Sequence, residues 1–201
     1  TAVGQNSLKS NTSGYSNVAI GQASLDANTT GYTNVAIGVE ALGACTTGYD
    51  NVAIGVEALD ASTTASNNTA VGRSALGANT TGTGNSALGR YALDANTTGD
   101  YNTALGLNSL SANTTADDNT AVGTNSLLTN ITGTKNVAVG AYALDAANTD
   151  NNTAIGYQAM TNATASECVA VGSRALKAQT TAARCTACLL YTSPSPRDSM
   201  T

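Results

Sequence analysis

The chain has 201 residues, of which 10% are charged and 4% are aromatic, and it contains no His, Trp or Phe. Its formal net charge of −5 comes from scattered acidic residues, whereas a nucleic-acid interface needs clustered Lys or Arg. No apolar run approaches the roughly 20 residues that span a bilayer. The composition therefore argues against contact with nucleic acid or with a membrane in this segment, and it leaves few side chains for catalysis.

The chain begins inside a repeated phrase. Thr1-Ala-Val-Gly4 lacks the Asn that opens later copies such as Asn17-Val-Ala-Ile-Gly21, so we expect the first repeat to be incomplete. The glycine of this phrase returns every 17 residues and then after two steps of 16, at Gly4, Gly21, Gly38, Gly55, Gly72, Gly89, Gly106, Gly123, Gly140, Gly156 and Gly172. A period below about 20 residues is too short for a helical hairpin, so each repeat is predicted to form one coil of a parallel β-roll or β-solenoid.

Numbered from its Asn, the repeat reads Asn, Val or Thr, Ala, Ile/Val/Leu, Gly, two variable residues, Ala or Ser, Leu, a variable residue, Ala, Asn, Thr, Thr, Gly and two variable residues. At about 3.3 Å per residue, this length allows two strands of four or five residues and two turns. Side chains alternate across a strand, so we expect positions two and four, with the Leu at position nine, to fill the coil. Glycine at position five and the Gly or Asn of the turn are expected to supply positive φ.

Position three is Ala in every repeat, and on this assignment it faces outward. A column of methyl-sized side chains indicates that another backbone packs closely against it, so we predict that this column forms an interface between copies of the chain. The predicted interface residues are Ala19, Ala36, Ala53, Ala70, Ala87, Ala104, Ala121 and Ala138.

The Asn at position one is predicted to stack as a ladder along the rod, because amide side chains hydrogen-bond well between parallel coils. This column is Asn17, Asn34, Asn51, Asn68, Asn85, Asn102, Asn119, Asn136 and Asn152. Cys168 and Cys185 take the place of Asn in the next two repeats, at a separation of about 5 Å that permits a disulfide. The alternative is that two small polar residues simply replace Asn. Cys45 lies in a turn and is expected to be a free thiol.

Three features of the turns allow more than one interpretation. Asn-x-Ser/Thr sequons are interpreted as duplicated turn chemistry rather than as glycosylation sites; they start at Asn11, Asn28, Asn79, Asn96, Asn113, Asn130 and Asn162. Tyr15, Tyr32 and Tyr49 share one turn column, where they either shield the edge of the roll or form an exposed stack for sugar or protein. The acidic residues near the turns lack the Gly-Gly-x-Gly-x-Asp order of calcium-binding rolls. We predict no metal and no cofactor for them; they include Asp94, Asp100, Asp117 and Asp118.

The repeat pattern stops after Ala187. Residues 188–201, which include Pro194 and Pro196, resemble the translation of a transposase-type sequencing adapter. We therefore predict a repeat domain over residues 1–187, incomplete at both ends, and a non-native tail over residues 188–201 that forms no strand. Cys185-Thr-Ala-Cys188 has the CxxC spacing of redox and zinc sites, but its second cysteine belongs to the tail, so no site is assigned.

The phrases Asn34-Val-Ala-Ile-Gly38, Asn51-Val-Ala-Ile-Gly55 and Asn152-Thr-Ala-Ile-Gly156 resemble the head repeats of YadA-like trimeric autotransporter adhesins. That family's signature is a recurring S/N-x-A-I/V-G, and the resemblance covers residues 1–187. It implies a left-handed parallel β-roll, three of which associate about a common axis, and it implies binding to host surfaces or matrix. The alanine column then becomes the expected trimer interface. The repeats here are longer than is common in the family, and the added length falls in the Asn-Thr-Thr-Gly turn.

The leading hypothesis is a non-enzymatic, extracellular adhesin head or stalk segment that trimerises at the cell surface, anchored in the outer membrane through a region outside this segment. A structural segment of a bacteriophage tail fibre, part of a virion, is the first alternative, since similar long repeats occur there. An ice-binding solenoid is the second, because Thr is abundant, although position two alternates between Val and Thr. An enzyme is not expected, since no cluster of acid, base and nucleophile recurs.

Overall fold

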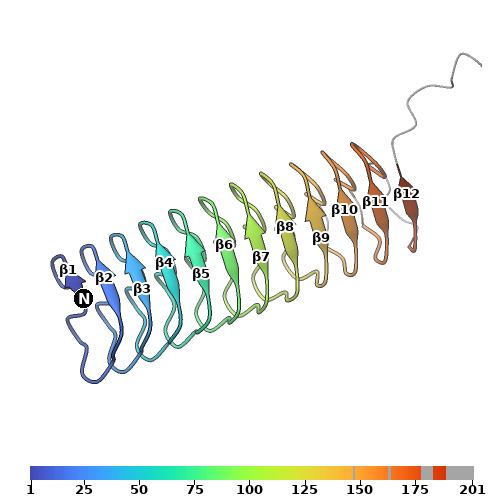
Figure 1. The fold of residues 1–201 in the computed structure, drawn as a ribbon. Helices are drawn as coiled ribbons and strands as arrows, with labels where there is room; N and C mark the ends of the chain where they lie inside the picture. Colours follow the sequence, from blue (N-terminus) through green and yellow to red (C-terminus); the bar gives the residue numbers. More distant parts are fainter. Residues whose placement is uncertain (147, 163, 178–182, 189–201) are drawn as a thin grey trace, which may run out of the picture.

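The structure, a computed structural model, describes residues 1–146, 148–162, 164–177 and 183–188. The chain forms a rod in which successive coils stack from one end to the other (Figure 1). The described residues contain no helix, and their strands form one parallel sheet in sequence order. The prediction of an all-β, parallel β-solenoid with about one coil per 17-residue repeat is therefore confirmed.

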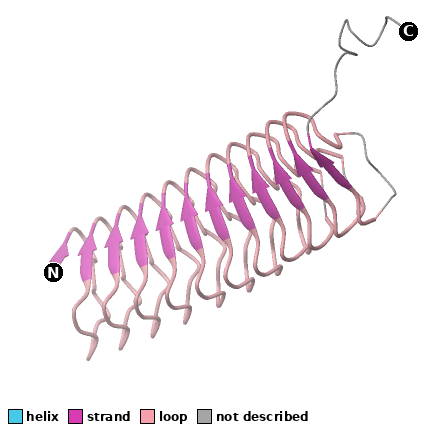
Figure 2. Cartoon of the chain, turned by 45° about the vertical axis from the view of Figure 1, so that its right-hand side comes forward, coloured by secondary structure: helices cyan, strands magenta, loops and turns pink. Residues whose placement is uncertain are grey.

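Each coil contributes one short strand to the 12-stranded sheet, and the strands lie side by side along the rod (Figure 2). The strands are β1 (Ala2–Val3), β2 (Val18–Ile20), β3 (Val35–Ile37), β4 (Val52–Ile54), β5 (Thr69–Val71), β6 (Ser86–Leu88), β7 (Thr103–Leu105), β8 (Thr120–Val122), β9 (Val137–Val139), β10 (Thr153–Ile155), β11 (Val169–Val171) and β12 (Thr186–Cys188). Equivalent residues of neighbouring coils pair, as in Ala36↔Ala53. The expectation of two strands of four or five residues per coil is wrong, because the rest of each described coil consists of turns and bends.

Left-handed backbone explains why the strand is so short. Gly55 at position five has φ 140, and a Cβ there would lie 2.5 Å from the carbonyl oxygen of Gly72 in the next coil. Glu57 and Leu59, at positions seven and nine, follow with φ 59 and φ 52. Positive φ at three alternate positions prevents a second extended segment. The glycines at position fifteen of the turn, such as Gly31, do not have positive φ, so the expectation is wrong there; positive φ falls instead at position seventeen, as at Asn67 and Gly84.

The predicted assignment of the two strand faces is reversed in the structure. In β4, Ala53 is fully buried inside the coil, whereas Ile54 is 37% exposed and points outward. The interior is narrow and already holds the Leu of position nine and the Ala or Ser of position eight, so position three has room only for a methyl group. The alanine column is therefore core and does not form an interface between copies of the chain; its predicted interface members were Ala19, Ala36, Ala53, Ala70, Ala87, Ala104, Ala121 and Ala138.

The Leu column at position nine is buried as expected. Leu59, Leu76 and Leu93 each have zero exposure, and Met160 takes the same place in a later coil. Each coil thus buries one large side chain, surrounded by small ones, and the stacked coils join these into a single continuous core.

The position-one asparagines, which we call the inner Asn column, are buried and linked along the rod. The backbone N–H of Asn51 donates to Oδ1 of Asn34 at 3.0 Å, and Asn51 Nδ2 donates to the carbonyl of Ala65 at 2.8 Å. The same two bonds recur in neighbouring coils. The predicted ladder is confirmed, and each Asn from Asn17 to Asn136 also holds the turn of its own coil.

Cys188 differs from its predicted place in the tail. It ends β12 and pairs with Val171 of β11, so the prediction that residues 188–201 form no strand is wrong at this residue. One residue of any type can extend a ladder when its neighbours Thr186 and Ala187 are already paired. The rest of the predicted tail, 189–201, lies outside the described residues.

Candidate functional site: an apolar strand face

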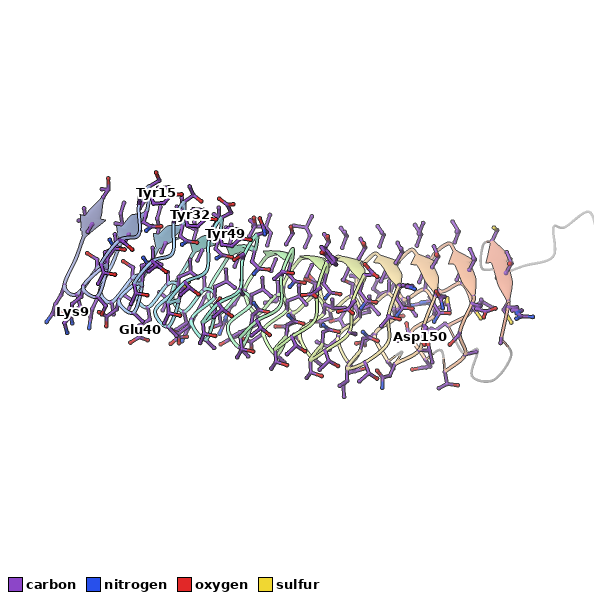
Figure 3. All side chains as sticks on the ribbon, turned by 90° about the horizontal axis from the view of Figure 1, so that it is seen from below. Lys9, Tyr15, Tyr32, Glu40, Tyr49 and Asp150 are labelled. Carbon is purple, nitrogen blue, oxygen red and sulfur yellow. The ribbon has the colours of Figure 1, made fainter. Side chains whose placement is uncertain are left out.

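The outward side chains at positions two and four of β1 to β12 form a surface that we call the strand face. Position two carries Val, Thr or Ser, and position four carries Ile, Val or Leu in every strand before β12. Ile54 is 37% exposed, Leu88 49% and Ile155 40%. In Figure 3 these side chains project from the row of strands along one side of the rod. Parallel register places like residues beside like, so the surface is continuous.

No charged side chain occurs at positions two and four of the 12 described strands. At about 4.8 Å per strand, the strand face runs for roughly 50 Å. Position six, which follows the glycine after each strand, also carries exposed apolar residues, namely Val39, Val56, Leu107 and Tyr157, whereas Arg73 and Arg90 occupy that position in two coils between. A long uncharged apolar surface of this kind marks an interaction site in a soluble protein.

The middle of the strand face is slightly hollowed. The small side chain of Ser86 stands between Thr69 and Thr103, next to Leu88 and Leu105. Together with Ala87 and Ala104, these five residues line a shallow groove without charged side chains. The groove gives the strand face relief into which a side chain of a facing surface can fit.

Tyr15, Tyr32 and Tyr49 form a stack beside the N-terminal strands (Figure 3). Ring centroids lie 5.1 and 4.9 Å apart, with planes within 5° of parallel. Burial, then the neighbouring Tyr49 and Tyr15 and finally Asp50, raise the pKa of Tyr32. Within the stack the rings cover one another's faces, which are the surfaces that sugars contact. This geometry favours the interpretation that the tyrosines shield the edge of the roll.

The sequon asparagines at position twelve, which we call the turn Asn column, are mostly inaccessible. Asn28, Asn79, Asn96, Asn113 and Asn130 have zero exposure. Each donates Nδ2 to the carbonyl of the residue three positions later, as Asn96 does to Gly99 at 3.0 Å. The interpretation that these five asparagines stabilise the turns is therefore confirmed. Asn11 and Asn162, the other two sequon asparagines, are exposed.

The structure does not bring the remaining candidate residues into a reactive centre. Cys188 points outward at position four, whereas Cys185 lies in the inner column, so the CxxC pair is not directed at one point. Burial raises the pKa of the Cys45 thiol to about 11, which makes it a poor nucleophile. The described residues include no group of three His, Cys, Asp or Glu that could hold a metal. The same part of the chain contains no helix that could span a membrane.

Sequence reasoning missed the strand face because it placed positions two and four inside. One signal was available: position two varies among Val, Thr and Ser, while position three is always Ala. Variation in side-chain chemistry is typical of an exposed position, and an unvarying small residue is typical of a narrow core.

Comparisons of the chain with protein-family models, with curated proteins and with solved structures found no match. Its function is therefore inferred from the geometry and chemistry of the strand face and the turns.

Proposed function

We propose that this chain is a rigid segment of a homotrimeric, extracellular adhesin, in which three rods pack through their strand faces and display their turns outward. The single observation that carries the proposal is the uncharged apolar strand face. The repeat phrase of the chain, Asn-Val-Ala-Ile-Gly, resembles the autotransporter heads. This resemblance supports the trimeric state and the cell-surface location in the proposal. No catalytic role is assigned to the chain.

Coverage by copies of the same chain agrees with the chemistry of the surface. The strand face has no charge to select an oppositely charged partner, and its length equals that of the rod itself. A second and a third copy match it along that whole length, since all have the same coil spacing. Burial of Ile, Val and Leu side chains contributes about 25 cal/mol per Å² of apolar surface, and the many coils multiply this gain.

Light scattering on the 201-residue chain tests the assembly. We expect a trimer for the wild type and a monomer for the double variant Ile54→Lys/Leu88→Lys, with circular dichroism unchanged because both side chains point out of the coil. Thr47→Lys, in an exposed turn, is the control with the same kind of charge, and it should remain trimeric. A monomeric wild type would overturn the proposed packing.

Attachment is tested separately, with beads coated with the wild-type chain and applied to plates carrying a basement-membrane extract. We expect the plates to retain more beads coated with the wild type than beads coated with the monomeric Ile54→Lys/Leu88→Lys variant, because a trimer offers three copies of each turn. Equal retention, or retention no greater than that of albumin-coated beads, would argue against an adhesin. A tail-fibre segment of a bacterial virus would share the same rod, and the reading frame on either side separates the two.

Ice binding is a second candidate that one observation favours. Position two faces outward, and over β5 to β8 it carries Thr69, Ser86, Thr103 and Thr120 in adjacent strands. A regularly spaced row of hydroxyl and methyl groups is the kind of surface that ice-binding solenoids use, although the shallow groove at Ser86 makes this row less flat. This use requires an uncovered strand face, so a monomer that lowers the freezing point below the melting point would support it, and a trimer would exclude it.

A further inference from the structure

Two cysteines occupy consecutive places in the inner Asn column. The backbone N–H of Cys168 donates to Oδ1 of Asn152 at 3.0 Å, and the backbone N–H of Cys185 donates to Sγ of Cys168 at 3.4 Å. The Cys168 sulfur thus takes the place that an amide oxygen holds in the earlier coils. It points along the rod toward the coil of Cys185.

The backbone brings these two residues to disulfide distance. The residues that follow them, Val169 and Thr186, pair across the parallel strands β11 and β12. Neighbouring parallel strands lie about 4.8 Å apart, within the Cα separation of about 4.4 to 6.8 Å that a disulfide spans. The residues that precede them, Glu167 and Arg184, form an ion pair at 2.7 Å across the same two coils.

A simple replacement of Asn by a small polar residue leaves a loss unexplained. In earlier coils the Asn side chain also donates to its own turn, as Asn119 Nδ2 does to the Gly133 carbonyl at 2.9 Å. A thiol is too short and too weak a donor to replace that bond. Cysteine at both positions removes two consecutive amides from the column, and a covalent link between those same two coils would offset their loss.

We propose that Cys168 and Cys185 form a disulfide that fastens β12 to β11. Cys185 is partly accessible and Cys168 is buried, so the Cys185 thiolate attacks first. It attacks a low-molecular-weight disulfide RSSR and forms a mixed disulfide, releasing RSH after protonation. The Cys168 thiolate then attacks the Cys185 sulfur and expels the second RSH. In sum, two thiols and RSSR give one protein disulfide and two RSH, so two electrons and two protons pass to the oxidant.

Peptide mapping of the whole chain tests this proposal directly. Cys188→Ser serves as the background, because trypsin leaves Cys185 and Cys188 in one peptide, 185–197, and Cys168 in another, 136–174. The protein is equilibrated with oxidised glutathione, blocked with N-ethylmaleimide under denaturing conditions and digested without reductant. We expect the two peptides to be linked, with a mass lower by two hydrogens than their sum, and to separate after reduction.

The matched control is Cys168→Ser in the same background, in which Cys185 should carry glutathione and no linked peptide should form. Hydrogen exchange adds a structural measurement: the amide of Ala187 should exchange several-fold more slowly in the oxidised chain than in the reduced one, because the position-three amide donates to the preceding coil, as Ala19 N–H does to the Thr1 carbonyl. Maleimide on both cysteines after oxidation, glutathione on Cys185 without a link to Cys168, or a link between Cys185 residues of two chains would each overturn the proposal.

Discussion

Cys45 lies one coil beyond Asn28 in the turn Asn column, and Oδ1 of Asn28 has no hydrogen-bond partner. At two later steps of this column the equivalent oxygen is satisfied: Asn96 Nδ2 donates to Asn79 Oδ1, and Asn113 Nδ2 donates to Asn96 Oδ1, both at 2.8 Å, whereas Asn113 Oδ1 also lacks a partner. Cysteine has no amide with which to make that bond. The column is therefore interrupted at a fully buried site, where an unsatisfied carbonyl costs about 1 to 3 kcal/mol.

Replacing Cys45 with Asn should restore the ladder and stabilise the protein by about 1 to 2 kcal/mol. The new Nδ2 can donate to Asn28 Oδ1 and to the Gly48 carbonyl, and the new Oδ1 can accept from Ser62, whose buried hydroxyl also has no partner. Urea unfolding of wild type and variant measures the gain. Cys45→Ala is the control, since it removes the thiol without supplying a donor and should show no gain. An unchanged midpoint for Cys45→Asn would contradict this account.

Replacing Ala53 with Leu should destabilise the protein by about 3 kcal/mol, because the added carbons must enter the filled interior of that coil. Ile54→Leu is the control at the adjacent position, where an outward apolar side chain is replaced by another one. It should change the free energy of unfolding by less than about 0.5 kcal/mol. Both values come from urea unfolding under conditions that keep the assembly state fixed. If Ala53→Leu were as stable as wild type, the alanine column could not be core.

The glycine period and the Leu column allowed the stacked coil to be predicted, because both depend only on spacing along the chain. The direction of Ala53 and Ile54 did not follow from alternation alone, since alternation separates two faces without saying which one is inside. Only the width of the coil decides that, and the width depends on left-handed φ at Glu57 and Leu59. Neither residue type favours that conformation, so no local signal in the sequence revealed it.

The inner Asn column was predictable as a stack, but its second role was not. Asn51 donates to Ala65, 14 residues later in the same coil, and that contact exists only once the coil has closed. The strand face was missed for the same reason that the alanine core was missed. Both depend on which of the two faces of each strand points into the coil. The Cys168 and Cys185 positions, by contrast, could be placed one coil apart from the period alone.

Replacing Gly55 with Ala should cost at least about 2 kcal/mol, because an L residue at φ 140 is strained and its Cβ would lie 2.5 Å from the backbone of Gly72. Gly77→Ala is the matched control. Gly77 lacks positive φ, and its Cβ would lie 3.0 Å from a side-chain oxygen of Asp94 and 3.3 Å from the Ser74 carbonyl oxygen, which leaves more room than at Gly55. Thermal unfolding should place Gly77→Ala near the wild type and Gly55→Ala well below it; equal effects would show that position five does not require glycine.

The acidic residues at position ten predict a dependence of stability on pH. Burial, and then the charges of Glu40 and Glu57, raise the pKa of Asp60 in the folded protein. Asp60 has no acidic neighbour at position ten, since Gly43 and Gly77 occupy that position in the two adjacent coils. Folding therefore favours the protonated form of Asp60. Its contribution to stability is fully present below the unfolded pKa and is lost as the pH rises through the raised folded pKa.

Asp60→Asn should accordingly be more stable than wild type at pH 7, where the wild-type carboxylate is charged and partly buried. The advantage should shrink as the pH falls through the raised folded pKa and disappear below the unfolded value, because the wild-type side chain is then neutral too. Urea midpoints at a series of pH values measure this difference. Asp118→Asn removes the same charge from an exposed site and serves as the control for net charge. A constant advantage of Asp60→Asn at every pH would mean that shape or hydrogen bonding, rather than the buried charge, separates the two side chains.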